Sequence, residues 1–457
     1  MMIRVLLILG ALSSIKIYAQ QNNVKMNPCQ VALSTETVDP FLKLSSSQIC
    51  LQYRFAELVT ENARYDWKQL KAEGRAEIIK RELKQVMQVR VAPYFPGLFS
   101  SYQMAKEKCA KEDPETTTYN CKNFVIQSLD HPIIYRGFFY PLVMFGTLKD
   151  IKNWVENMPY YDLNKILYPE LSDTRPKERV TLAEIIAGHY LVDMDVLEYF
   201  FERGNIALDS DESFPVHTAV INKDNKKFDY LYEKSFDKNG LNTKNYQKYF
   251  EQKLTPADGD GLLHLAISYD NAYAFKKLIN DPEIDVNLNN TPRKETPLMF
   301  AAYFAIYNMK YEKDDYMFKQ LIAHTDIDVN KAAMDETSTY INMFSLYLEI
   351  NQSFNSKEQK YLIKDVINHP RFDARLNCPK DSQCLGAVIR VVPFEIFKLY
   401  EPLAEVLDYE SKIYKFNGKS YDIISFVQAY EKVSPNKSDI SRILSLLKKW
   451  KSQYSKS

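Results

Sequence analysis

The sequence is poor in the residue types on which many catalytic and nucleotide-binding sites depend. It has only 12 glycines and six scattered histidines among 457 residues, and no C-x-x-C pair. So few glycines argue against the Gly-rich loops that cradle phosphates. The formal net charge is zero, so the overall composition gives no reason to expect nucleic-acid binding.

The common catalytic fingerprints are also missing. No G-x-S-x-G, H-E-x-x-H, Walker or dinucleotide pattern occurs. Asp258-Gly-Asp-Gly261 resembles part of a calcium loop but lacks the later ligands of one, so a tight turn is the better interpretation. We therefore expect no catalytic residue, no cofactor and no metal site, and the alternative of an enzyme would place its site within residues 20–130.

The first 19 residues have the pattern of a secretory leader. Arg4 supplies a positive charge, Val5 to Ile15 form a short apolar run, and Ala19 is a small residue before Gln20. The run is too short to cross a bilayer, and no later window approaches the necessary length, so no membrane span is predicted. The sequence thus predicts export to the periplasm or the extracellular space.

All six cysteines lie after the leader, and an even number in an exported chain favours disulfides. They form three pairs that are close in sequence: Cys29 and Cys50, Cys109 and Cys121, Cys378 and Cys384. We expect each cysteine to bond to its near neighbour, although 15 connectivities are possible. Buried free thiols are one alternative, and zinc ligation is a weaker one.

Apolar spacing predicts a helical N-terminal region over residues 20–130. Residues 20 to about 45 are polar and are interpreted as loop or a short capping element, whereas residues 47 to about 88 and 98–110 carry apolar residues at helical spacing. We expect this region to form a helical cap that covers the first repeat of the remaining chain.

A short motif recurs in the second half of the chain. Ile284-Asp-Val-Asn287 returns as Ile327-Asp-Val-Asn330, and Pro370-Arg-Phe-Asp-Ala-Arg-Leu-Asn377 is a degraded third copy. A helical pattern precedes each copy, and recurrence at a few tens of residues is typical of stacked repeat proteins. Helix pairs are expected throughout residues 131–457.

These residues resemble ankyrin repeats, in which Thr-Pro-Leu-His opens a first helix and Gly-Ala-Asp-Val-Asn comes after a second. Phe214-Pro-Val-His217, Leu262-Leu-His264 and Thr296-Pro-Leu298 match the opening. The match is best over 181–335, is degenerate after 335, and departs from the family's spacing. The resemblance implies an all-α, ankyrin-like helical-hairpin solenoid with a helical N-terminal cap; another helical-hairpin solenoid is the alternative. It also implies that His217 and His264 brace turns.

The resemblance further implies a partner-binding role, because ankyrin proteins meet other proteins with their finger tips and the exposed side of their first helices. An immunity or inhibitor protein, or a periplasmic helper, is the form we expect, and a secreted effector is the alternative. The partner's identity is not encoded in the motifs. Carried over position by position, the predicted partner-binding residues are Asp211, Ser213, Asn222, Asp258, Asp260, Tyr269, Arg293, Glu295, Tyr303 and Phe304.

Overall fold

The computed structural model shows a mostly helical protein, which confirms the all-α class. It describes residues 27–34, 39–113, 117–126, 132–158, 162–164, 181–208, 214–235, 238–239, 259–290, 294–308, 315–331, 333–334, 340–341, 360–373, 376, 384–391 and 393–454. The chain divides into two compact units, an N-terminal unit of Met1–Lys234 and a C-terminal unit of Ser235–Ser457. The division falls inside the region where repeats are predicted.

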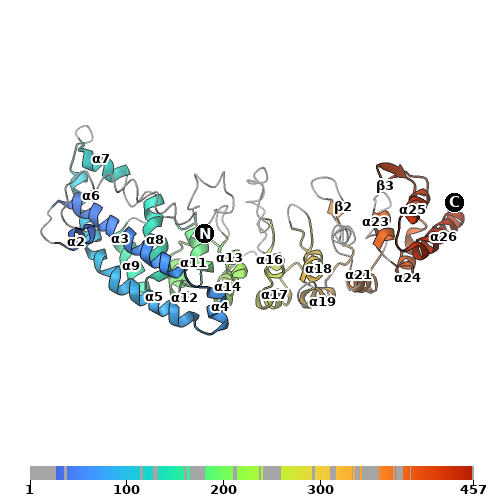
Figure 1. Ribbon diagram of the computed structural model, residues 1–457, viewed down its shortest axis with the longest axis horizontal. Coiled ribbons are helices and arrows are strands. Elements are labelled where there is room, and N and C mark those ends of the chain that lie inside the picture. Colours follow the sequence, from blue (N-terminus) through green and yellow to red (C-terminus); the bar gives the residue numbers. More distant parts are fainter. Residues whose placement is uncertain are drawn as a thin grey trace. The chain divides into compact units, whose positions relative to one another are not determined.

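The described part of the N-terminal unit is built from helices alone (Figure 1). Two long helices, α3 and α6, pack against each other and against the short α2, and α3 also contacts α5 and α8. The helices are α2 (Pro28–Leu33), α3 (Pro40–Asn62), α4 (Trp67–Ala72), α5 (Ala76–Arg90), η1 (Ala92–Tyr94), α6 (Phe95–Ala110), α7 (Tyr119–Ile126), α8 (Pro132–Phe145), α9 (Leu148–Asn157), α11 (Leu182–Gly188), α12 (Met194–Glu202), α13 (Pro215–Ile221) and α14 (Asn225–Lys234).

Local capping explains where several of these helices begin. Residues 20 to about 45 are expected to be loop or a short capping element, and the short α2, which starts at Pro28 behind a capping box formed by Asn27 and Gln30, agrees with the second alternative. The expected helix start at residue 47 is wrong, because α3 already starts at Pro40 behind Asp39. A proline in the first turn loses no helical hydrogen bond, because the first N–H groups have no partner within the helix. The polar composition of this stretch therefore reflects helix caps.

Two of the three expected disulfides are present. Cys29 bonds to Cys50 and ties α2 to α3, whereas Cys109 bonds to Cys121 and ties the end of α6 to α7. This confirms both sequence-local pairings. The third expected pair, Cys378 and Cys384, lies outside the part of the chain that the structure describes.

The C-terminal unit continues with short helices and two small hairpins. In each hairpin the two strands are antiparallel, with Ala333 opposite Ile341 and Phe416 opposite Lys419. The elements are α16 (Leu262–Ser268), α17 (Ala272–Ile279), α18 (Pro297–Asn308), α19 (Tyr316–Ile322), β1 (Ala333–Met334), β2 (Tyr340–Ile341), α21 (Lys360–Ile367), α23 (Cys384–Val391), α24 (Phe394–Phe397), η5 (Lys398–Leu403), β3 (Tyr414–Phe416), β4 (Lys419–Tyr421), α25 (Ile423–Glu431) and α26 (Lys437–Tyr454).

Neighbouring helix pairs in the C-terminal unit contact each other in the same way. Helix α16 packs on α17 within its pair and on α18 of the next pair, while α17 contacts α19 and α18 contacts α19 (Figure 1). The small residues Ala266, Ala301 and Ala302 are buried at these first helices. Small buried side chains let helices approach closely, which fits the packing of α16 on α18.

An asparagine side chain links each described motif copy to the next loop along the chain. The amide of Asn287 donates to the carbonyl oxygen of Asp326 at 2.7 Å and accepts from the backbone N–H of Asp328 at 2.7 Å. The same two-bond pattern, from one side-chain amide to a carbonyl and to the N–H two residues later, recurs at Asn164 (to Asn205 and Ala207), Asn239 (to Glu283 and Asp285) and Asn330 (to Arg371 and Asp373).

The aspartate of the motif orients this asparagine. Asp285 accepts from the backbone N–H of Asn287 at 2.9 Å, and Asp328 does the same for Asn330 at 2.9 Å. Such Asx turns fix a tight bend without a helix or strand. The recurring Asp-x-Asn therefore has a physical meaning: the aspartate shapes the loop, and the asparagine bonds to the next loop.

Candidate functional site

Three of the predicted partner-binding residues lie on, or directly after, the first helices of two adjacent pairs. Tyr269 comes directly after α16 and Tyr303 lies on α18, and both residues are 39% exposed. Phe304 is half-buried beside Tyr303, with ring centroids 5.4 Å apart in an edge-to-face arrangement. Since α16 packs on α18, these rings belong to one region of the C-terminal unit.

Two further rings, those of His264 and Phe300, connect α16 to this aromatic region of α18. His264 of α16 packs edge-to-face on Phe300 of α18 at 5.0 Å, and Phe300 lies 6.1 Å from Phe304. Aromatic pairs at such distances contribute beyond their buried area. The exposed Tyr303 thus stands at the end of a packed aromatic row.

Asn222, the corresponding residue of the N-terminal unit, is exposed at the end of α13. It precedes Lys223, whose φ is 56°, just as Tyr269 precedes Asp270, whose φ is 50°. Both helices therefore end in the same left-handed turn. Asn222 donates to the carbonyl oxygen of Thr218 at 2.9 Å, so part of its amide is used within its own helix.

Two of the predicted contact residues are buried and do not lie on the surface. Asp260 and Glu295 are only 2% and 5% exposed. Asp260 accepts from the side chain of Asn290 at 2.7 Å, and the backbone of Glu295 forms a bond in each direction with Asn290. The expectation that they lie at exposed tips is wrong, because Asp260, just before α16, and Glu295, just before α18, are both buried beside Asn290. Asp211, Ser213, Asp258 and Arg293 lie outside the described residues.

His264 braces this same loop, as the sequence predicts. Its Nε2 lies 3.1 Å from the carbonyl oxygen of Glu295, and a carbonyl can only accept, so Nε2 carries the proton. Burial lowers the pKa of His264 to about 4, against the opposing effect of the bond to Glu295. A buried, neutral histidine held in this way is a poor general base. His217 is likewise buried, against Phe214.

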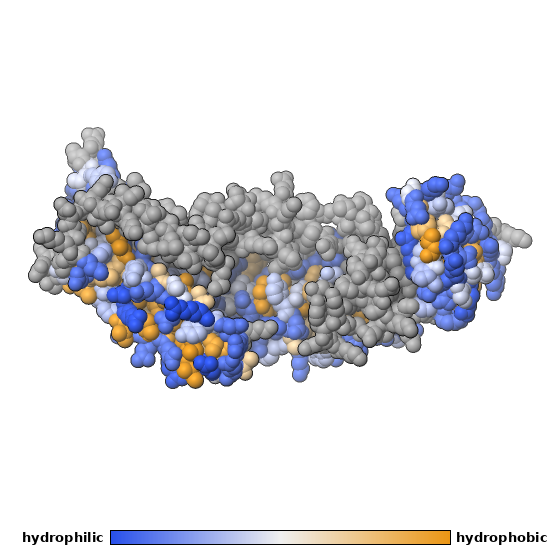
Figure 2. All heavy atoms as spheres, viewed as in Figure 1, coloured by the Kyte–Doolittle hydropathy of each residue, from blue (hydrophilic) through white to orange (hydrophobic). Residues whose placement is uncertain are grey.

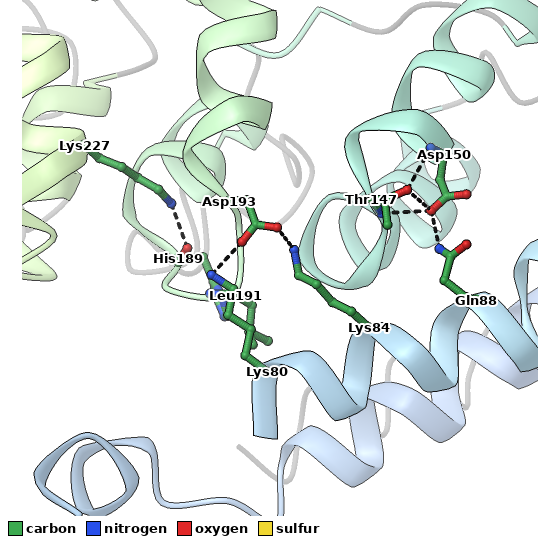
Figure 3. Close-up of polar contacts among 9 residues, drawn as sticks. All are labelled: Lys80, Lys84, Gln88, Thr147, Asp150, His189, Leu191, Asp193 and Lys227. Carbon is green, nitrogen blue, oxygen red and sulfur yellow. Dashed lines mark hydrogen bonds and ion pairs between the residues drawn. The ribbon is translucent and has the colours of Figure 1, made fainter. Parts of the chain in front are cut away.

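A polar network in the N-terminal unit is the second candidate site (Figure 3). Lys80 and Lys84, one turn apart on α5, both pair with the carboxylate of Asp193, which precedes α12; the Lys80 distance is 2.7 Å. Although burial by itself would raise it, the bonds from the two lysines hold the pKa of Asp193 below its ordinary value. The pairing joins α5 to the turn between α11 and α12.

The next turn of α5 makes an analogous contact. Gln88, four residues after Lys84, donates to Asp150, which lies in the first turn of α9 and forms a capping box with Thr147. Residues at i, i+4 and i+8 share one face of a helix. One polar stripe of α5 therefore reaches the acidic residues at the starts of both α9 and α12.

Lys227 of α14 belongs to the same network and bonds to the end of α11. Its Nζ donates to the carbonyl oxygens of Ile186 and His189 at 2.9 Å each, and Asp224 lies 3.7 Å away. These carbonyls belong to the end of α11, where no helical partner is available. Burial lowers the pKa of Lys227 to about 8, opposed by the attraction of Asp224.

The ring of His189 is also drawn into this packing. It stacks on Tyr190, and Tyr190 in turn meets Trp67 at 4.2 Å. Burial, and then the charges of Lys227 and other nearby lysines, lower the pKa of His189 to about 4. Asn62 accepts from both Trp67 and Tyr190, at 3.0 and 3.2 Å. The α11–α12 turn is thereby fastened to the α3–α4 segment.

The network has the chemistry of a brace. The lysines are engaged by carboxylates or backbone carbonyls, and His189 accepts from the backbone N–H of Leu191 at 3.2 Å. No motif in the sequence singles out Lys80, Lys84 or Lys227. The spacing of Lys80, Lys84 and Gln88 is the available signal, but it does not say which surface the stripe would meet.

Within the ranges that the structure describes, no group of three or more His, Cys, Asp or Glu side chains is arranged to hold a metal ion. Over those same ranges, none of the helices has both the length and the apolar character required for a membrane crossing. Comparison with known protein families finds no family model that matches the chain, and comparison with curated proteins finds no matching protein.

Proposed function

We propose that this chain is an exported, non-enzymatic protein-binding protein built as an ankyrin-like solenoid of helical hairpins. The observation that carries the proposal is the recurring asparagine bridge, because it links each loop to the next in one repeated geometry. Repeat proteins in which each module contacts only its neighbours mostly offer an extended surface to other proteins. Restraint of a toxin or enzyme is the role we favour.

Export is supported by two observations. The leader pattern of residues 1–19 is one. The other is the pair of disulfides in the N-terminal unit, since disulfides persist mainly in oxidising compartments. The mature chain should begin at Gln20 or Gln21. Intact-mass analysis of the native protein measures this directly, and a cytosolic protein that retains residues 1–19 contradicts it.

The proposed contact surface is the exposed aromatic group of Tyr269 and Tyr303, with Phe304 beside them. Tyrosines contribute large contact area at a small entropic cost and are enriched among binding hot spots. Their neighbours Asp260 and Glu295 are buried, so they add no acidic rim. The surface therefore favours a partner that offers an apolar or aromatic anchor point.

Site-specific photo-crosslinking tests this surface. A benzophenone amino acid is placed at position 269 or 303 in the native host, with position 119 as the matched control, since Tyr119 is 70% exposed but lies on α7. We expect one discrete protein adduct from the first two positions and none from the third. The same adduct from all three positions, or an adduct from position 119 alone, contradicts the assignment.

Affinity for the partner so identified gives the quantitative test. Tyr269→Ala and Tyr303→Ala should each weaken binding by about 2 kcal/mol, the size expected of a hot spot, whereas Tyr119→Ala should leave binding unchanged. Thermal unfolding of each variant provides the control. A partner that tolerates both substitutions in folded protein binds elsewhere.

A further inference from the structure

One position recurs just after α17, α19 and α21, helices that lie in a row along the C-terminal unit (Figure 1). It is occupied by Asp281, His324 and His369. At each of the three, the backbone N–H bonds to the carbonyl oxygen three residues earlier, at 3.1, 3.0 and 3.2 Å. The carbonyl oxygen of each in turn accepts from the N–H three residues later, at 3.1, 3.2 and 2.9 Å. The three residues are therefore structurally equivalent.

The side chain at this position accepts a hydrogen bond from the backbone N–H two residues later. In Asp281 the acceptor is Oδ1, at 2.9 Å from that nitrogen. Each histidine uses Nδ1 instead: that of His324 lies 3.1 Å from the nitrogen of Asp326, and that of His369 lies 3.2 Å from the nitrogen of Arg371. A ring nitrogen accepts only while it carries no proton, so this arrangement requires both histidines to be neutral.

The residue that donates to the histidine also supplies the carbonyl of the asparagine bridge. The carbonyl oxygen of Asp326 accepts from Asn287, and that of Arg371 accepts from Asn330, both at 2.7 Å. The loop of Asp281 has the same arrangement through Glu283, whose carbonyl oxygen accepts from an asparagine of the preceding segment. The side chain that braces each loop therefore also positions the residue to which the preceding loop is bound.

Protons can reach both histidines from solvent. The two rings are half-buried, whereas Asp326 and Arg371 beside them are exposed, and Figure 2 shows hydrophilic residues on the visible surface at α17 and α19. The charged side chains in these loops and on the helices packed beside them have both signs. They are Asp285, Lys319, Asp326, Asp328, Asp365, Arg371 and Asp373.

The surroundings of His369 favour its neutral form. Burial, and then the positive charge of Arg371, lower the pKa of His369, and a bond to the backbone of Ile322 opposes them. A histidine whose pKa is lowered on folding stabilises the folded loop above its ordinary titration range near pH 6.5. That contribution is lost as the pH falls through this range, because the unfolded chain then binds more protons.

We propose that His324 and His369 make two consecutive loop connections of the C-terminal unit sensitive to mild acid. A proton on Nδ1 turns the acceptor into a second donor that faces the N–H of Asp326 or Arg371. The brace is then lost, and the residue that binds the asparagine is no longer held. The connection before them has Asp281 at this position, and aspartate ordinarily titrates near pH 4, so that connection stays closed at pH 5. The device does not depend on a bound partner.

Amide-resolved hydrogen exchange of the mature full-length protein, compared at about pH 7.5 and about pH 5, tests the proposal. Rates are corrected for the intrinsic pH dependence of exchange. Protection of the Asp326 and Arg371 amides should fall by up to about fivefold relative to the Glu283 amide, the change that corresponds to one net hydrogen bond. Glu283 is the internal control, because its N–H donates to the carboxylate of Asp281.

Two substitutions separate the histidines from the rest of their loops. His324→Asn keeps an acceptor that does not titrate and suits an Asx turn, so the Asp326 amide should lose its pH response while the Arg371 amide keeps it. Asp281→His should transfer the response to the Glu283 amide. Equal loss of protection at all three amides of the wild-type protein, no loss at Asp326 and Arg371, or a response at Asp326 that persists in His324→Asn would each overturn the proposal. Circular dichroism at both pH values checks that the variants remain folded.

Discussion

Replacement of Asn287 by alanine tests whether the side-chain bridges hold successive loops together. Asn287→Ala removes a donor to the carbonyl oxygen of Asp326 and an acceptor for the N–H of Asp328, both at 2.7 Å. A typical hydrogen bond contributes about 1 kcal/mol net, so the two together are worth about 2 kcal/mol. The backbone N–H of Asp328 is directly involved, which makes the effect observable at one amide.

Native-state hydrogen exchange is the appropriate assay. An opening that costs about 2 kcal/mol less corresponds to roughly 30-fold faster exchange at the Asp328 amide. The matched control is Asn280→Ala, because the side chain of Asn280 donates to the carbonyl oxygen of Lys276 in its own helix, at 2.6 Å, and makes no other bond to a described residue. That change should leave the Asp328 amide unaffected.

Asn330 provides an independent test of the same bridge. Asn330 makes the same pair of bonds to Arg371 and Asp373, at 2.7 and 2.8 Å. Asn330→Ala should therefore accelerate exchange at the Asp373 amide and leave the Asp328 amide much closer to its original rate. If Asn287→Ala leaves exchange at Asp328 unchanged, the bridges contribute nothing to stability and the repeated geometry has no energetic basis.

The buried groups and the cross-links lead to three more expected outcomes. Lys227→Met removes the donor to the carbonyl of Ile186 and one of two donors to the carbonyl of His189, which also accepts from the N–H of Val192; it should cost the N-terminal unit about 2 kcal/mol in urea unfolding, whereas the exposed Lys226→Met should cost almost nothing. The pKa of His264 falls to about 4 on folding, so the unfolded chain binds more protons between about pH 4 and 6.5; stability should fall as pH falls through that window, and His264→Gln should flatten the slope. Replacing both Cys109 and Cys121 by alanine should destabilise by about 2 to 3 kcal/mol for this short loop, and an unchanged melting temperature would argue against it.

The sequence by itself determined the features that rest on local chemistry. Helical spacing indicated the all-α class, and cysteines 21 and 12 residues apart formed the two described disulfides as expected. The Ile-Asp-Val-Asn motif marked the loops correctly, because an Asx turn involves residues only two apart. The error in the start of α3, predicted at residue 47 and found at Pro40, was also local, since Asp39 and Pro40 are helix-start residues.

The tertiary structure alone decided which side chains are covered and which distant elements meet. Asp260 and Glu295 are residue types usually found at the surface, but both are buried, and Asn290 bonds to the side chain of Asp260 and to the backbone of Glu295. Lys84 finds its carboxylate 109 residues away, so no window of sequence contains both. A periodic pattern states which residues share a face, but only packing states what that face meets, because burial depends on neighbours that the local pattern does not specify.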